Sequence, residues 1–311
     1  MISLPRLSLS SERRLWASLA TALSCSACAA GGGQGSETSV TQSAQAGSGK
    51  PSTPSTPVNG AAPSAPDGPM FNADDLVPTD ECDGNLPVIY RDFSQTHPDF
   101  EMEFSGDVVR RQLIEPTLGA DGKPVFKSNV GCPAKKDTPT SCDNWSVTKP
   151  VITSADSFNQ WYRDTPNVNI AFEKTLELVD SGGGLYKFNS TQFFPLDNQQ
   201  GSFGITPPNS GHNFLFTTEV HVTFEYVKGQ TFTFQGDDDM WIFVNRKLAL
   251  DLGSMHSSER GVIDFDAQAA DLGIAVGHAY PMDIFHAERH TSASNFGVET
   301  NIACFSPPIV R

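Results

Sequence analysis

The chain has 311 residues, of which 21 are Lys or Arg and 36 are Asp or Glu, so its formal net charge is −15. This balance argues against a nucleic-acid binder, whose surface would carry a basic patch. It permits cation binding, because carboxylates supply the oxygen ligands that calcium prefers. An aromatic fraction of 10%, with 21 Phe, favours a β-rich core.

Residues 1–28 predict an export signal. Three Arg precede an apolar stretch at 15–23, which is too short to span a bilayer as a helix. The segment resembles a bacterial lipoprotein signal, with Cys28 as the expected lipidation site and Cys25 as the alternative. Simple cleavage after Ala29 is a third possibility. We therefore expect an exported cell-surface or outer-membrane lipoprotein that meets a membrane only through its N-terminal lipid, or else a secreted protein.

Residues 29–70 predict a disordered linker, because Gly, Ser, Pro and other small or polar residues dominate them. The remaining part, 71–311, is the predicted folded domain. It carries 17 Lys and Arg against 33 Asp and Glu, so the acidity belongs to this domain.

Four cysteines fall in the domain, and an even number in an exported chain predicts disulfides. Three pairings are possible. We favour Cys132–Cys142, which closes a short loop, with Cys82–Cys304 joining the two ends of the domain.

Strand patterns dominate the domain. Residues 219–226 and 231–235 alternate between apolar and polar side chains around a Lys-Gly turn, which predicts a hairpin. Residues 241–245 are more continuously apolar, as in a strand covered on both faces. Further strands are expected at 168–178, 185–188, 262–265, 280–289 and 296–302. Short helices are expected at 154–162, capped by Ser154, and at 267–272, ended by Gly273. An all-β sandwich or barrel with few helices is the predicted fold class.

The run Asp237, Asp238 and Asp239 lies between two predicted strands. Adjacent carboxylates repel one another, and a bound cation is one way to offset that repulsion. A calcium ion takes six to eight oxygens, so it would need a second loop as well. The alternative is a solvated acidic turn.

A second cluster is His286, Glu288 and His290, whose spacing places them on one face of a strand. His and Glu are zinc ligands, so a metal-dependent enzyme is one hypothesis. The favoured alternative is a polar strand face in which Glu288 pairs with a His or with Arg289.

Aromatic residues are the third candidate set. Exposed rings could stack on sugars, but core packing is the commoner use. No catalytic nucleophile motif and no phosphate-binding glycine loop occurs, so we expect no enzyme activity. The set comprises Trp161, Tyr162, Phe193, Phe194 and Trp241.

The stretch 158–300 resembles the fibro-slime domain of slime-mould and bacterial surface proteins, within the protective-antigen β-barrel superfamily. The resemblance implies a jelly-roll-like sandwich. About 210 residues are covered once the segments at 97–101 and 121–126 are included. It rests on the segments FNQWYRDTPNVN (158–169), FFPLDN (193–198), HNFLFTTEVHVTF (212–224), FTFQGDDDMWIFVNRKLALDLG (232–253) and YPMDIFHAERHTSASNF (280–296).

Sugar-binding members of this superfamily hold calcium on two adjacent Asp, and these fall on Asp237 and Asp238. The family has Gly where this chain has Asp239. A later loop adds an Asn, for which Asn295 is the candidate. The resemblance thus implies a calcium and ligand site at Asp237, Asp238 and Asn295, with Asp239 as a further metal ligand.

Three functions remain open from the sequence. The first is a surface-tethered, calcium-dependent carbohydrate-binding or adhesion module, with a glycan or matrix polysaccharide as partner and no nucleic acid. The second is a structural matrix protein without a small ligand. The third is the metal-dependent enzyme, which we rank last.

Overall fold

The computed structural model describes residues 71–72, 84–103, 106–135, 138–142 and 149–307. The expected signal, linker and lipidation sites, and Cys82, lie outside these ranges. Within them, no helix is both long and apolar enough to cross a membrane.

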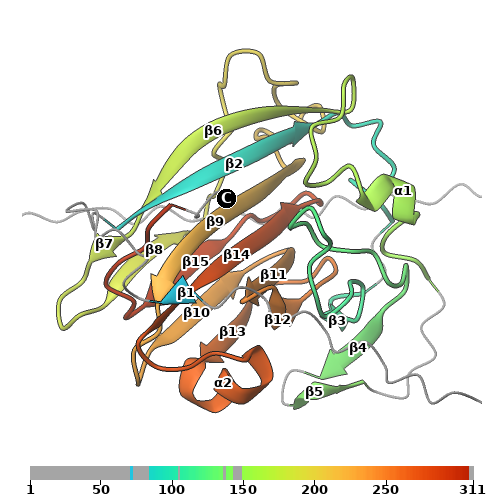
Figure 1. Cartoon of the computed structure of the whole chain (residues 1–311). Coiled ribbons are helices and arrows are strands. Elements are labelled where there is room, and N and C mark those ends of the chain that lie inside the picture. The colour runs from blue at the N-terminus through green and yellow to red at the C-terminus, as the bar shows by residue number, and fades with distance from the viewer. Residues whose placement is uncertain (1–70, 73–83, 104–105, 136–137, 143–148, 308–311) are drawn as a thin grey trace, which may run out of the picture. The chain divides into compact units, whose positions relative to one another are not determined.

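Two antiparallel sheets build the domain (Figure 1). The larger has the strand order β12-β11-β14-β9-β2-β6, and β1 also pairs with β14. Its strands are β1 (Phe71–Asn72), β2 (Asn85–Phe93), β6 (Asn169–Glu177), β9 (Phe216–Glu225), β11 (Asp239–Val244), β12 (Lys247–Leu252) and β14 (His278–Glu288).

The smaller sheet has the order β13-β10-β15-β8-β7. Its strands are β7 (Val179–Asp180), β8 (Tyr186–Ser190), β10 (Thr231–Gly236), β13 (Glu259–Asp264) and β15 (Phe296–Thr300). A third sheet contains β3 (Arg110–Arg111), β4 (Cys132–Lys135) and β5 (Thr138–Cys142). The predicted all-β sandwich is therefore confirmed, with its sheets open.

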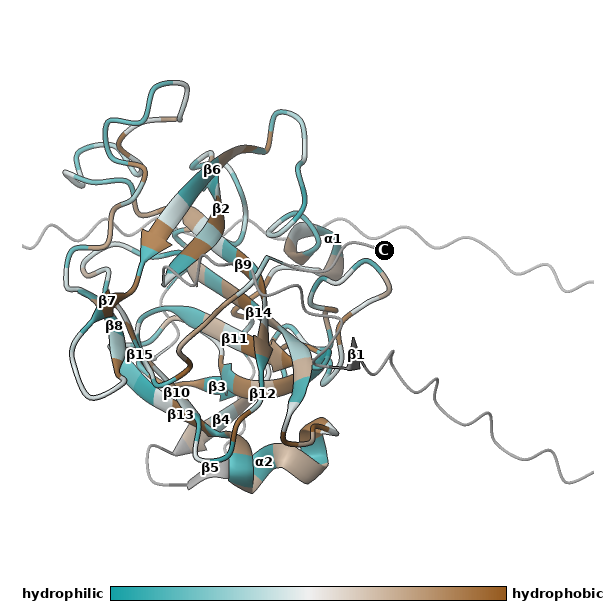
Figure 2. Ribbon diagram, turned by 60° about the vertical axis from the view of Figure 1, so that its left-hand side comes forward, coloured by the Kyte–Doolittle hydropathy of each residue, from teal (hydrophilic) through white to brown (hydrophobic). Residues whose placement is uncertain are grey.

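The main core lies between the two large sheets. Alternate residues of β9, including Val220, Val222 and Phe224, face Phe232 and Phe234 of β10 across this layer. Figure 2 shows the resulting alternation of hydrophobic and hydrophilic positions along the strands. Because alternate side chains leave a strand on opposite faces, the period-two pattern encodes this layer directly.

A second core covers the opposite face of the larger sheet. There Trp241 and Phe243 of β11 pack with Trp161 and Tyr162 from the loop after α1. This explains the continuous apolar run of β11, because both of its faces are buried. Four of the five aromatic candidates are buried in the two cores, and Phe194 is partly buried against the second core.

Two short helices complete the fold. Helix α1 (Ala155–Phe158) begins after Ser154, whose side chain accepts a hydrogen bond from the Ser157 N–H, as predicted. Helix α2 (Phe265–Leu272) ends at Gly273 with φ 68°, the left-handed conformation expected there.

The predicted hairpin of residues 219–226 and 231–235 is wrong. Strand β9 pairs with β14 and β2, whereas β10 pairs with β13 and β15, so the turn at 228–229 connects the two sheets. Both strands carry an apolar stripe, and two such stripes can face each other across a core as readily as they can lie side by side. Alternation alone does not distinguish these arrangements.

Cys132 and Cys304 are both disulfide-bonded. Strand β4 pairs with β5 so that Ala134 lies opposite Cys142. The Cys132–Cys142 and Cys82–Cys304 pairings stay predictions, because Cys82 and the Cys142 side chain lie outside what the structure describes.

Candidate functional site

The acidic run lies where the chain passes from one sheet to the other. Strand β10 ends at Gly236 in the smaller sheet, and β11 begins at Asp239 in the larger sheet. Asp237 and Asp238 form the connection, and the peptide bond between them is cis. The acidic pair is therefore held at both ends by strands of the two sheets.

Asn295 is bound tightly to Asp237. Its backbone N–H donates to Oδ1 of Asp237 at 2.6 Å, and its side-chain amide donates to Oδ2 at 2.6 Å. The Asp237 N–H donates in return to the Asn295 carbonyl at 3.2 Å. The structure thus brings together the three residues predicted to form one site, across 58 positions of sequence.

Among the described residues, Asp238 accepts hydrogen bonds from backbone groups alone. The His256 N–H donates to Oδ1 at 3.2 Å and the Arg289 N–H donates to Oδ2 at 3.2 Å. These bonds leave lone pairs on both carboxylate oxygens, because each oxygen can accept two. Asp238 therefore retains the capacity to bind a cation.

A pocket of about 260 Å³ opens over this pair. Apart from the two carboxylates, its lining consists mainly of hydroxyl, imidazole and amide groups from the loops at 256–258 and 290–295. It is lined by Asp237, Asp238, His256, Ser257, Ser258, His290, Thr291, Ser292, Ala293 and Asn295.

Asp239 is placed apart from the pair. Its Oδ1 accepts from the Ser254 N–H at 2.6 Å, and its Oδ2 accepts from Nε of Arg289 at 2.6 Å. Both side chains of this ion pair are fully buried, and the pocket lining excludes Asp239. The charge that sequence reasoning assigned to a metal instead compensates Arg289, so we do not retain Asp239 as a ligand.

His286 is a buried structural residue. One ring nitrogen lies 3.1 Å from Oγ1 of Thr218 and the other lies 2.9 Å from the carbonyl oxygen of Asp237. Burial lowers the pKa of His286 to about 4, so the ring is neutral at physiological pH. With both nitrogens engaged, the predicted zinc-type cluster does not assemble around it, and it supports the Asp237 backbone.

Glu288 is fully buried on the same strand and forms no ion pair with a described side chain. The Ser294 side chain and the His290 backbone lie near its carboxyl group and lower its pKa, but burial outweighs them. Arg289, one of its expected partners, pairs with Asp239 instead. Burial raises the pKa of Glu288 well above its usual value, and Asp238 and Asp237 raise it further. Burial likewise raises the pKa of Asp238, against the opposing effect of Arg289. A cation at this position would lower the raised pKa values of Glu288 and Asp238.

The residues present fit an oxygen-liganded cation such as calcium. No three His, Cys, Asp or Glu side chains within the described ranges are arranged as a complete metal-binding group. Calcium, however, also takes amide, backbone carbonyl and water oxygens, and the pocket offers two carboxylates and an amide. Asp237, Asp238 and Asn295 would hold such an ion.

The two loops that wall the pocket were missed by sequence reasoning. Ser257, Ser258, Thr291 and Ser292 are ordinary polar loop residues in the sequence, and no spacing links the segment at 256–258 to the one at 290–295. Only the fold brings the ends of β12 and β14 together at this point.

Gly236 sets the distance between the acidic pair and Asn295. A Cβ there would lie 2.3 Å from the Asn295 carbonyl oxygen and 2.6 Å from Cζ of Phe234. We expect Gly236→Ala to cost about 1–3 kcal/mol in the free energy of unfolding, because overpacking shifts the backbone. Urea denaturation measures this. Gly297→Ala, with a nearest contact at 3.0 Å to a side chain, should cost less; equal stability of Gly236→Ala and wild type would contradict the account.

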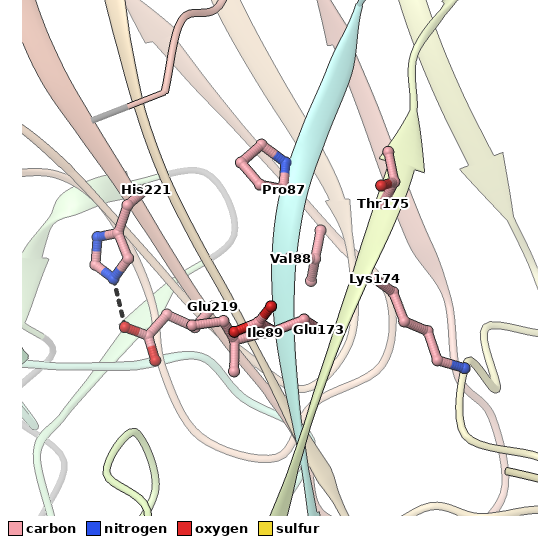
Figure 3. Close-up of a pocket in the computed structure, with 8 residues that line it drawn as sticks. All are labelled: Pro87, Val88, Ile89, Glu173, Lys174, Thr175, Glu219 and His221. Carbon is pink, nitrogen blue, oxygen red and sulfur yellow. Dashed lines mark hydrogen bonds and ion pairs between the residues drawn. The ribbon is translucent and has the colours of Figure 1, made fainter. Parts of the chain in front are cut away.

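A larger pocket, of about 430 Å³, lies on the outer face of the larger sheet (Figure 3). Glu219 forms its buried floor and is ion-paired with Arg91 at 2.5 Å, with Lys123 and with His221. His221 in turn lies 2.6 Å from Asp283. This network was not predicted from the sequence.

The charges around Glu219 are already balanced. Burial alone would raise the pKa of Glu219, but His221, Arg91 and Lys123 outweigh it and lower this pKa to about 2. A carboxyl with so low a pKa is a poor proton donor or acceptor near neutral pH. The pocket with the incompletely compensated carboxylates, at Asp237 and Asp238, is therefore the better candidate site.

Comparison with known proteins finds similar chains in Dictyostelium discoideum, and no family model matches. Protein psiD is 35% identical over 221 residues, which are 70% of this chain and 41% of psiD. Protein psiR is 32% identical over 232 residues, 71% of this chain and 21% of psiR. Protein psiC is 32% identical over 225 residues, 69% of this chain and 40% of psiC. The absence of a family-model match leaves the fibro-slime resemblance untested.

The chain thus spans less than half the length of these relatives. Among solved structures, the epithelial adhesin 6 A domain of Candida glabrata, in complex with Galβ1-3GlcNAc, aligns with 78% of this chain and 98% of its own at 11% identity and a TM-score of 0.28. A GH31 α-xylosidase from Xanthomonas citri aligns with 43% of this chain and 14% of its own at 12% identity and a TM-score of 0.26. Scores this low support no inference about fold or ligand.

Proposed function

We propose that this chain is a calcium-dependent carbohydrate-binding or adhesion module of an exported protein. The observation that carries the proposal is the placement of Asp237 and Asp238, with Asn295, in a pocket walled by hydroxyl-bearing loops. The similarity of its motifs to the fibro-slime domain supports the same assignment. Calcium would supply a Lewis-acidic centre that binds oxygen ligands.

The chain's own residues account for the rest of the binding. Asp237 is oriented by two hydrogen bonds from Asn295, and Asp238 is oriented by two backbone N–H groups. Calcium takes more oxygens than these three side chains supply, so hydroxyl groups of a ligand can complete its coordination. Ser257, Thr291 and neighbouring polar groups can bond the other sugar hydroxyls.

Export and surface attachment complete the proposal. The N-terminal signal, with Cys28 as the lipid-bearing residue and Cys25 as the alternative, would place the module outside the cell. The disulfide-bonded state of Cys132 and Cys304 agrees with an oxidising compartment. The proposed partner is a surface glycan or matrix polysaccharide.

A glycan array in calcium and in EGTA tests this function. We expect binding of the wild-type chain to a subset of glycans in calcium, and its loss in EGTA. Asp237→Asn and Asp238→Asn should lose at least tenfold in apparent affinity, because each removes an anionic ligand. Asp121→Asn, in an exposed ion pair with Arg163, is the control and should bind normally. An array without binding in calcium would instead favour a structural matrix protein.

A further inference from the structure

Glu288 is a buried carboxyl group beside the acidic pair that has no positively charged partner among the described residues. It is the last residue of β14 and is fully buried, and no positively charged side chain among the described residues pairs with it. The nearby Ser294 side chain and His290 backbone do not offset its burial. A buried carboxylate without a partner is costly unless an opposite charge compensates it. Packing alone therefore does not explain why a carboxyl group occupies this position.

The strand register puts Glu288 directly behind the acidic pair. In the β11–β14 ladder, Met240 lies opposite His286 and Asp239 lies opposite Ala287. One step further along the ladder, Asp238 falls opposite Glu288. The hydrogen bond from the Arg289 N–H to Asp238 confirms that the two segments remain adjacent there.

The nearest buried cation does not compensate Glu288. Arg289 uses Nε to bind Asp239, and one terminal nitrogen donates to the carbonyl oxygens of Asp99 and Val151. The Cζ atom of its guanidinium also lies 4.7 Å from the centre of the Trp161 ring, which belongs to the second core. Arg289 directly follows the last residue of β14, and its side chain enters the second core, so it is directed away from Glu288.

We infer that Glu288 is the third acidic group of the cation site and sets its affinity for a divalent ion. It lies beneath Asp237 and Asp238 and acts through its charge rather than by contacting the glycan. The affinity of calcium sites depends on how many negative charges surround the ion. This inference rests on the proposed function, because it assigns a role within the same site.

Calorimetric titration of the full chain with calcium chloride tests the inference. We expect Glu288→Gln to weaken calcium binding at least tenfold, because the substitution keeps the shape and removes the charge. Glu299→Gln is the matched control. It removes the same charge from an exposed ion pair with Lys187 on the smaller sheet, and its calcium affinity should stay within twofold of wild type.

Thermal melting in EGTA separates this role from a purely structural one. Without the ion, Glu288→Gln should melt at or above the wild-type temperature, because an uncompensated buried charge has been removed. Unchanged calcium affinity in Glu288→Gln would overturn the inference alone, as would a variant whose weaker affinity accompanies a lower melting temperature in EGTA. A wild-type chain that binds no calcium would overturn the proposed function as well.

Discussion

Replacing Arg289 with alanine should lower the free energy of unfolding by about 3–5 kcal/mol, because the change breaks a fully buried ion pair. Asp239 would then keep its charge with only the Ser254 N–H as a partner. The variant would also lose the hydrogen bonds to the Asp99 and Val151 carbonyls and the contact with Trp161. Guanidinium denaturation followed by tryptophan fluorescence measures the loss.

Two variants control this experiment. Arg289→Lys keeps the charge but loses the planar fork, so its stability should fall between wild type and Arg289→Ala. Arg163→Ala breaks a partly exposed pair with Asp121 and should cost no more than about 1 kcal/mol. If Arg289→Ala and Arg163→Ala unfolded at the same denaturant concentration, the buried pair would not have the importance assigned to it.

The contribution of the Glu219–His221 network to the free energy of unfolding should be greatest between about pH 4.5 and 6.5. Glu219 has its pKa lowered from 4.5 to about 2, so its stabilisation is present above 4.5 and is lost as pH falls towards 2. Burial would lower the pKa of His221, but Asp283 and Glu219 outweigh it and raise this pKa from 6.5 to about 9. That stabilisation is present below 6.5 and is lost as pH rises towards 9. Each of these two pKa shifts contributes about 3 kcal/mol to the free energy of unfolding, which is lost on the acid limb for Glu219 and on the alkaline limb for His221.

Glu219→Gln should remove most of both limbs at once, since His221 and Glu219 stabilise each other's charged forms. His221→Gln should flatten the alkaline limb and leave part of the acid limb, because Arg91 and Lys123 still bind Glu219. Urea midpoints from pH 2 to 10 measure both effects. A Glu219→Gln profile parallel to that of wild type would show that the network does not control the pH dependence.

Much of the fold could be predicted because burial in a strand leaves a period-two signature. The apolar faces of β9 and β10 were recognised in this way, and the double-sided burial of β11 followed from its continuous apolar run. The pairing partners were not encoded locally. The stripes of β9 and β10 are compatible with a hairpin and with two facing sheets, and only long-range packing selects the second.

The candidate site was predicted in part. The resemblance placed Asp237, Asp238 and Asn295 together, and in the structure all three line one pocket, with Asn295 hydrogen-bonded to Asp237. The resemblance could not show that Asp239 differs from Asp237 and Asp238, because Asp239 binds Arg289, which lies 50 positions away in the sequence. For the same reason the sequence could not predict that Glu288 lacks a charged partner, because partners are set by residues that only the fold brings near it.

Isothermal titration of the purified full chain with calcium is the most direct measurement of the central claim. We expect one saturable calcium site per chain, with a dissociation constant of about 10⁻⁴–10⁻³ M or tighter, as in extracellular modules. It also predicts a melting temperature that rises with calcium concentration, and the loss of both signals in Asp238→Asn. A wild-type chain that shows neither binding heat nor a melting shift at saturating calcium would contradict the claim.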